Sequence, residues 1–193
     1  MDVFEAITTR GSHRKYLQTP VPREVITRCV EMAGRAPSPH NDQMWHFTVV
    51  TSREAIEQMA HEVDSELDAL FVTLDSTDPT AKMVRKFSTF FRHAPAVVAV
   101  LMEPYVSVIG KVLPQIGMDH TETNEKRGNP DYQAVGAAIQ NFLLAATAQG
   151  YATCWLSGPV FARERLEKVL GVTNPWGLVA LITIGLPDGE IRQ

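Results

Sequence analysis

The chain of 193 residues has little cysteine and no excess of positive charge. Its two cysteines, Cys29 and Cys154, lie in apolar stretches and form no spacing motif, so we expect buried free thiols rather than a disulfide. Lys and Arg number 18 against 22 for Asp and Glu, a net charge of −4. This charge argues against a general nucleic-acid binder or a protein of anionic membrane surfaces. The cysteine usage indicates a reducing, cytoplasmic compartment.

Long apolar runs are also missing. The run at residues 94–102 is much shorter than the ~20 residues that a membrane-spanning helix needs. Residues 1–16 are charged throughout and contain no apolar core of a signal peptide. Hydrophobic residues make up 45% of the chain and charged residues 21%, an ordinary balance for a globular protein. We therefore expect one domain over residues 1–193, with no membrane partner.

The familiar catalytic signatures are missing as well. The sequence contains no Gly-x-Gly-x-x-Gly after a strand, no Walker loop and no Gly-x-Ser-x-Gly elbow. Its six histidines are scattered and form no pair at helical ligand spacing. We expect neither a nucleotide loop of these types, nor an acyl-transfer serine, nor a metal site.

Hydrophobic periodicity predicts an α+β or mixed α/β fold, with several helices around a small sheet. The expected helices are residues 2–9, 22–35, 53–72, 79–92, 131–150 and 162–170, and the expected strands are residues 46–51, 96–101, 151–156 and 177–186. The strand at 96–101 is apolar throughout and should be buried on both faces. The helix at 131–150 should begin with Asp131 as its N-cap and end before Gly150. Residues 103–130 look irregular and are a candidate substrate cap.

Two clusters of polar residues suggest a binding site. Arg10, Ser12 and Arg14 alternate, so an extended chain would point two guanidinium groups and a hydroxyl to one side, as a clamp for phosphate or a polyol. An exposed basic turn is the alternative. Asn41 and Gln43 each offer donors and an acceptor, which suits a flat heterocycle with carbonyl and N–H groups. Capping of their own loop is the alternative.

A third cluster follows the strand at 151–156. Leu156, Ser157 and Gly158 end this strand, where a glycine allows the backbone to approach a ligand and a serine adds a hydroxyl. An ordinary turn is the alternative.

Taken in order, the three clusters resemble the motifs of the flavin-dependent nitroreductase family. The Arg-x-Ser-x-Arg motif stands here at residues 10–14, and the Ala-Pro-Ser-x-x-Asn-x-Gln-Pro-Trp motif at residues 36–45. The apolar helix, the glycine and the Cys-Trp-Leu turn of small residues stand at residues 141–158. The resemblance extends from about residue 4 to residue 187.

The resemblance implies a nitroreductase-like fold, in which helices surround a central, mostly antiparallel sheet, and an intertwined homodimer with two FMN sites. FMN would be bound by Arg10, Gly11, Ser12, Arg14, Pro37, Ser38, Pro39, Asn41, Gln43, Leu156, Ser157 and Gly158. The first segment would hold the phosphate and ribityl chain, and loop 37–43 would reach the flavin from the other subunit. Residues 156–158 would lie against the isoalloxazine, and helix 131–150 would form dimer core.

Enzymes of this family pass a hydride from NADH or NADPH through FMN to a nitroaromatic, a quinone or a related small acceptor. The flavin carries the chemistry, so the resemblance implies no catalytic side chain. Part of the sequence also resembles the FMN domain of deazaflavin-pathway ligases. A specialised flavin protein of the same fold, dehalogenase-like, enoate-type or flavin-fragmenting, and a non-catalytic flavin-binding dimer are the alternatives.

Three positions depart from the family pattern. Met44 replaces the proline before Trp45, which places a flexible thioether near the expected pocket. Gly11 stands where a second basic residue is common. The chain ends shortly after the last strand, so only Arg192 could replace a C-terminal phosphate ligand.

Overall fold

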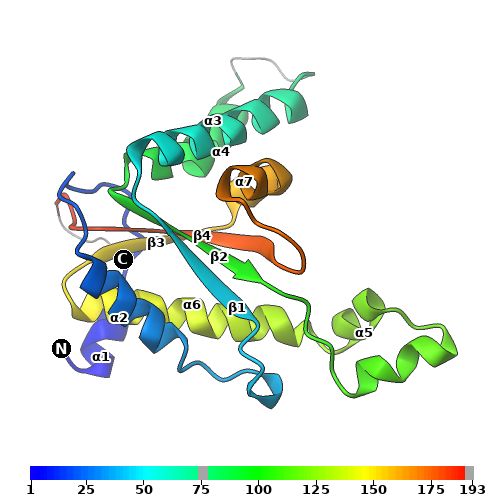
Figure 1. Ribbon diagram of the computed structural model, residues 1–193. Coiled ribbons are helices and arrows are strands. Elements are labelled where there is room, and N and C mark those ends of the chain that lie inside the picture. Colours follow the sequence, from blue (N-terminus) through cyan, green and yellow to red (C-terminus); the bar gives the residue numbers. More distant parts are fainter. Residues whose placement is uncertain (74–77, 190–193) are drawn as a thin grey trace.

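Four strands form one sheet between two layers of helices in the computed structural model, which describes residues 1–73 and 78–189 (Figure 1). The strands are β1 (Trp45–Val50), β2 (Ala96–Met102), β3 (Ala152–Leu156) and β4 (Gly177–Gly185). Their order is β1-β2-β4-β3, and every neighbouring pair is antiparallel. The predicted α+β class and antiparallel sheet are confirmed.

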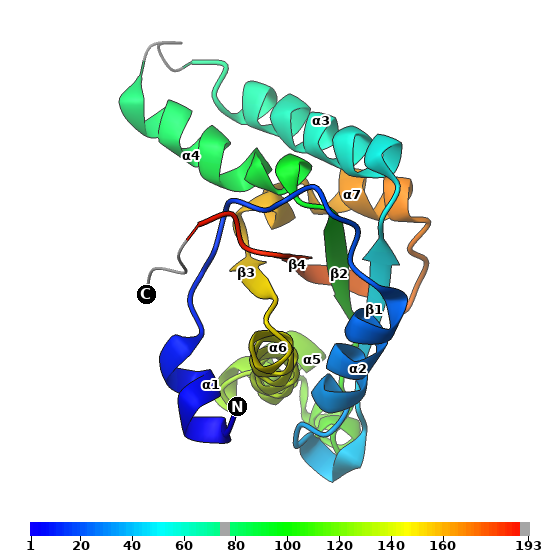
Figure 2. The same ribbon diagram turned by 90° about the vertical axis from the view of Figure 1, so that its left-hand side faces the viewer.

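The helices are α1 (Val3–Thr9), α2 (Arg23–Ala33), α3 (Arg53–Leu70), α4 (Pro79–Thr89), α5 (His120–Lys126), α6 (Pro130–Ala148) and α7 (Arg163–Leu170). Helices α3, α4 and α7 cover one face of the sheet, and α6 runs below the other face with α1 and α2 on either side of it (Figure 2). Short 3₁₀ turns follow α2, α4 and β3, at Pro39–Asn41, Phe90–His93 and Gly158–Ala162. Among the described residues, no helix is long and apolar enough to cross a membrane.

Strand β2 joins two hydrophobic cores, as its apolar sequence predicts. Ala96, Val98 and Val100 pack with α2 and α6, and the residues between them pack with α3 and α7. The predicted thiols, Cys29 and Cys154, are both buried and free. The side chains from Ala96 to Leu101 are therefore buried and Met102 is partly buried, which accounts for a strand without polar residues.

The region between β2 and α6 is more ordered than the sequence suggests. Residues 103–130 contain two 3₁₀ turns, Ile109–Lys111 and Leu113–Ile116, in addition to α5. The Asp119 side chain accepts a hydrogen bond from the Glu122 N–H (2.9 Å) and caps α5. We refer to residues 103–128 as the projecting segment, because they extend beyond the end of α6 in Figure 1.

The predicted N-cap of helix α6 is wrong by two residues. Asn129 occupies the cap with a positive φ of 53°, and Asp131 lies inside the first turn. The Asp131 carboxylate is buried and accepts a hydrogen bond from Asn124 Nδ2 at 2.8 Å. Its role is to fix α5 against α6, which a cap signal in the sequence does not reveal. Gly150 ends the helix with a φ of 80°, as predicted.

Candidate functional site

The segment at residues 10–14 leaves α1 and runs beside β3 in an extended conformation. Ser12 forms a parallel bridge with Thr153, and the His13 N–H donates to the Thr153 carbonyl at 2.9 Å. Gly11 and His13 are buried, whereas Ser12 and Arg14 are exposed and Arg10 is half-buried. The predicted alternation is present, because the backbone pairing with β3 turns successive side chains to opposite sides.

The two guanidinium groups of this segment are candidates for binding an anion. Among the described residues, no carboxylate forms an ion pair with Arg10 or Arg14. Arg14 Nη1 donates to the Ser12 carbonyl at 3.3 Å, and its guanidinium lies 5.4 Å from the centre of the Phe87 ring. Two cations without a counter-ion suit an anionic ligand. Arg192 lies outside the described residues.

The buried thiol behind this segment is not a reactive group of the site. Burial raises the pKa of Cys154, while the nearby Arg14 charge and a hydrogen bond with Ser12 lower it. Burial is the largest of these effects, so the thiol is neutral near pH 7. Cys154 contributes packing rather than a nucleophile.

Residues 156–158 lie next to this segment, at the end of β3. The Leu156 side chain is buried in the core with α3 and α7, so it leaves only backbone for a ligand. Ser157 is exposed. A Cβ on Gly158 would lie 2.8 Å from Ser88 Oγ of α4, so close packing against α4 is sufficient reason for this glycine.

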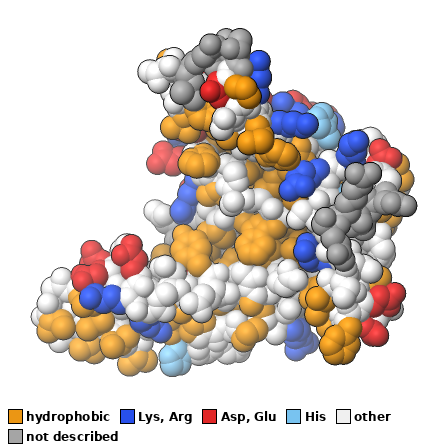
Figure 3. Space-filling view, turned by 180° about the vertical axis from the view of Figure 1, so that it is seen from behind, with side chains coloured by type: hydrophobic (Ala, Val, Ile, Leu, Met, Phe, Trp, Pro, Cys, Tyr) orange, Lys and Arg blue, Asp and Glu red, His pale blue; other side chains and the backbone are white. Residues whose placement is uncertain are grey.

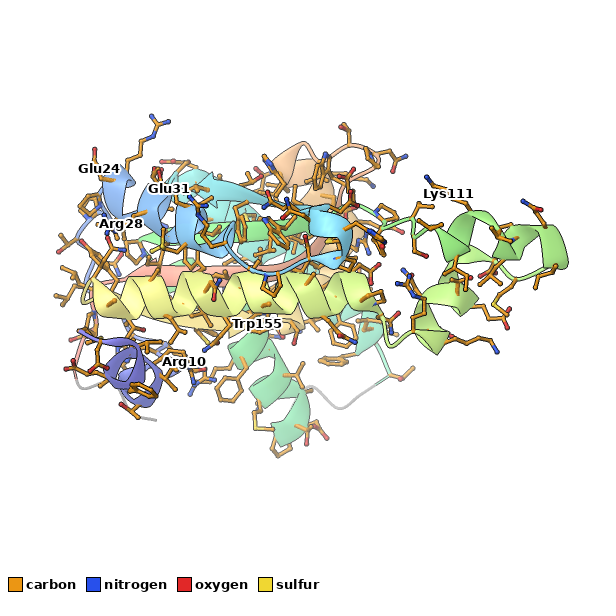
Figure 4. All side chains as sticks on the ribbon, turned by 90° about the horizontal axis from the view of Figure 1, so that it is seen from below. Arg10, Glu24, Arg28, Glu31, Lys111 and Trp155 are labelled. Carbon is orange, nitrogen blue, oxygen red and sulfur yellow. The ribbon has the colours of Figure 1, made fainter. Side chains whose placement is uncertain are left out.

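Helix α4 thus belongs to the site, although no sequence motif indicated it. Ser88 is buried beneath Gly158, and Phe87 is 47% exposed beside Arg14. Trp155 is 45% exposed and lies on the same side of α6 as Arg10 (Figure 4). An aromatic residue at helical spacing is ordinarily core, so the sequence alone could not single out Phe87. Figure 3 shows the molecule from behind, and apolar side chains line part of a hollow on that face.

Loop 37–43 has an unusual backbone. His40, Asn41 and Gln43 have φ values of 54°, 58° and 49°, a region that costs a residue other than glycine about 1–3 kcal/mol. Gln43 Nε2 donates to the Gly34 carbonyl at 3.2 Å and to Asn41 Oδ1 at 3.4 Å. Both side-chain amides are exposed, but their hydrogen bonds cap their own loop. Such capping is the alternative to ligand binding that the sequence left open. Met44 is fully buried, so its thioether packs in the core of this chain.

One chain does not bring the predicted site residues together. The segment at residues 10–14 and Trp155 lie on the α1 side of α6, and loop 37–43 follows α2 on the other side (Figures 2 and 4). A cavity of about 860 Å³ lies between α2 and β1, but no predicted cofactor residue lines it. Within residues 1–73 and 78–189, no group of three His, Cys, Asp or Glu side chains could hold a metal ion.

Comparisons with known proteins agree with the α+β fold described above. A sequence model of the Nitroreductase family matches residues 7–186. The crystal structure of a BluB-like flavoprotein from Clostridium difficile 630 superposes with a TM-score of 0.89 and is 31% identical. The alignment covers 100% of this chain and 93% of that one.

More distant relatives also match along most of the chain. A Bacillus subtilis (strain 168) protein, YfhC, provisionally named an NAD(P)H nitroreductase, is 24% identical over 95% of this chain and 84% of its own length. A Desulfitobacterium hafniense DCB-2 nitroreductase crystallised with FMN is 21% identical, with a TM-score of 0.72 over 98% of this chain and 91% of that one. The family match spans most of the sequence and the fold agrees with it, so the chain belongs to the nitroreductase family.

Proposed function

We propose that this protein binds FMN and passes a hydride from NADH or NADPH through it to a nitroaromatic, a quinone or a related small acceptor. The observation that carries the proposal is the extended segment beside β3, which presents Arg10, Arg14 and the Ser12 hydroxyl on one side. No carboxylate of the described residues pairs with either arginine. Relatives named as NAD(P)H nitroreductases, and a fold shared with FMN-bound structures, support it.

The residues of this face fit the parts of FMN. Arg10 and Arg14 match the phosphate oxygens through their guanidinium forks, and the Ser12 hydroxyl suits the ribityl chain. The backbone at Ser157 and Gly158 offers polar groups to the ring. FMN held by these residues would supply the two-electron chemistry that links the nicotinamide to the acceptor. The protein supplies binding, orientation and electrostatics, and no acid–base side chain is required.

We further propose that the site is completed in a homodimer. Loop 37–43 cannot reach residues 10–14 of its own chain across α6, whereas the loop of a second copy could supply Ser38, Asn41 and Gln43. Helix α1 exposes Val3, Phe4 and Ile7 at 58%, 77% and 52%. Apolar side chains exposed together beside an incomplete site are typical of a subunit interface.

A specialised flavin protein of the same fold is the second candidate. The similarity to a BluB-like flavoprotein favours it, since a TM-score of 0.89 exceeds the 0.72 of the Desulfitobacterium nitroreductase. This candidate retains the FMN site and changes only the reaction that follows. Its signature is reduction of the flavin without turnover of a nitroarene or a quinone, or chemical loss of the flavin itself.

The test is an absorbance spectrum of the purified protein, followed by anaerobic titration with NADH and with NADPH. We expect flavin bands that bleach with at least one nucleotide and return when a nitroarene or quinone is added. Colourless protein that takes up no added FMN would contradict the proposal. Flavin that neither nucleotide bleaches would point to a non-catalytic flavin-binding dimer.

A further inference from the structure

Tyr105 connects the projecting segment to loop 37–43. Its side chain is only 2% exposed, although many neighbours in this segment, such as Val106 and Val108, are more than half exposed. The centre of the Tyr105 ring lies 6.3 Å from that of His40, with the two planes tilted by 31°. Two stretches far apart in the sequence therefore share an aromatic contact.

The same ring is covered by a cation from α5. The guanidinium carbon of Arg127 lies 5.6 Å from the centre of the Tyr105 ring, within the range of a cation–π interaction. Arg127 is the C-cap residue of α5, and its N–H donates to the Asn124 carbonyl at 3.1 Å. The position of this cation is thus set by the end of a helix.

Helix α5 is in turn fixed to the centre of the fold. Asn124 and Asp131 are 6% and 3% exposed, and the 2.8 Å hydrogen bond between their side chains joins α5 to the first turn of α6. Because α6 packs beneath the sheet, the end of α5 has a defined place relative to the core. Arg127 and Tyr105 can therefore act as a fixed support for His40.

Loop 37–43 needs such a support, because three of its residues have left-handed backbone conformations that side chains disfavour. On the α2 side, the Gln43 side chain bonded to the Gly34 carbonyl holds the loop. On the opposite side, His40 contacts the Tyr105 ring, and the 3₁₀ turn Pro39–Asn41 also lies against α6. The loop is thus held at both ends of its distorted stretch.

We infer that Arg127 and Tyr105 are positioning residues, which hold loop 37–43 in the shape that presents Asn41 and Gln43 to the cofactor. The inference rests on the proposed function, since it gives the shape of the loop a role in FMN binding. Neither residue touches the cofactor in this assignment. They act through His40 and lower the free energy of the binding-competent loop relative to other conformations.

Hydrogen exchange of the full chain without cofactor measures the support directly. The N–H groups of Asn41, Asp42 and Gln43 are hydrogen-bonded to the Ser38 carbonyl, the Pro39 carbonyl and Ser38 Oγ. We expect Arg127→Gln to speed their exchange about two- to fivefold, the effect of losing one exposed cation–π contact. Arg127→Lys keeps the charge and should stay near the wild-type rate. Lys126→Gln removes the adjacent charge, which contacts no aromatic ring among the described residues. It also removes an exposed ion pair with Glu122 (3.7 Å), a contact of little energy, so the exchange should stay near the wild-type rate.

A second pair of variants covers the ring itself. Tyr105→Phe keeps the aromatic contact and should leave the exchange of the loop unchanged, whereas Tyr105→Leu should speed it. FMN titration of the same proteins should show dissociation constants raised by a smaller factor than the one seen in exchange, because the apparent constant rises only as the reciprocal of the ordered fraction of the loop. Arg127→Gln alters an exposed side chain, so it stays informative if Tyr105→Leu does not fold.

Unchanged exchange of the loop in Arg127→Gln and Tyr105→Leu would overturn the inference. Weaker FMN binding without faster exchange would also overturn it, because the residues would then act by another route. Faster exchange would confirm that Arg127 and Tyr105 hold the loop, even if no variant takes up FMN. A wild-type protein that takes up no FMN contradicts the proposed function alone.

Discussion

The Arg14 side chain uses little of its hydrogen-bonding capacity. A guanidinium has five N–H donors, and the donor accounted for here is the one that contacts the Ser12 carbonyl at 3.3 Å. The Phe87 and Phe90 rings, 5.4 Å and 5.9 Å from the guanidinium carbon, orient the group without neutralising it. Arg14 is therefore already oriented for an anion, and binding would require little reorganisation of the side chain.

Arg14→Ala should weaken FMN binding roughly 10- to 150-fold, the effect of losing a charged hydrogen bond worth about 1.5–3 kcal/mol. Arg14→Lys keeps the charge but loses the guanidinium fork. Its affinity for FMN should lie between those of the wild type and Arg14→Ala. The measurement is fluorescence titration of the cofactor-free protein with FMN. Lys15→Ala, a neighbour on the opposite side of the extended segment, is the matched control. Equal affinity of Arg14→Ala and the wild type would remove Arg14 from the phosphate site.

At the scale of elements, the buried pair Asn124 and Asp131 decides where the projecting segment sits. Asp131→Ala leaves the Asn124 amide buried without its acceptor, which should lower the free energy of unfolding by about 1–3 kcal/mol. Asp131→Asn keeps an acceptor oxygen on a side chain of the same size, so it should lower the free energy of unfolding less than Asp131→Ala does. Urea unfolding followed by circular dichroism gives both values. Equal losses in the two variants would show that the carboxylate charge matters here rather than its hydrogen bond.

The elements that the sequence predicts well are those with a strong hydrophobic pattern. The apolar run of β2 could be assigned because both faces are buried, and α3 because Ile56, Met59, Ala60 and Val63 follow helical spacing. Helix α5 was missed because its apolar pattern is weak, although Asp119 and Glu122 at capping spacing were a usable signal. The Asp131 error has a different origin, since a capping residue and a tertiary acceptor look alike in one sequence.

The alternation of the site could be predicted from the residues themselves, whereas its division between two chains was expected only from the family resemblance. Alternate residues of an extended segment share a side, so Arg10, Ser12 and Arg14 could be grouped before the fold was known. Motif order says nothing about which side of α6 a loop reaches, nor that Ser88 of α4 packs on Gly158. The left-handed φ at His40 and Gln43 was equally out of reach, because both residues ordinarily avoid it.

At the scale of the molecule, the two halves of the proposed site lie on opposite sides of α6, and this makes the dimer testable by complementation. Arg14→Ala damages the first segment, and the double variant Asn41→Ala, Gln43→Ala damages the loop. In a heterodimer of these two chains, one site would receive an intact segment from one chain and an intact loop from the other. The second site would carry both defects.

We therefore expect weak FMN binding from each variant alone and recovery when the two are unfolded together and refolded as a mixture. Random pairing makes about half of the dimers mixed, with one intact site of two, so roughly a quarter of the sites should recover wild-type affinity. Equilibrium dialysis with FMN measures the fraction of sites that bind with wild-type affinity. The control mixture, Arg14→Ala with Arg10→Ala, should recover none, because both defects lie in the same segment and every site of its mixed dimers keeps one. Recovery in neither mixture would mean that each site is formed within a single chain.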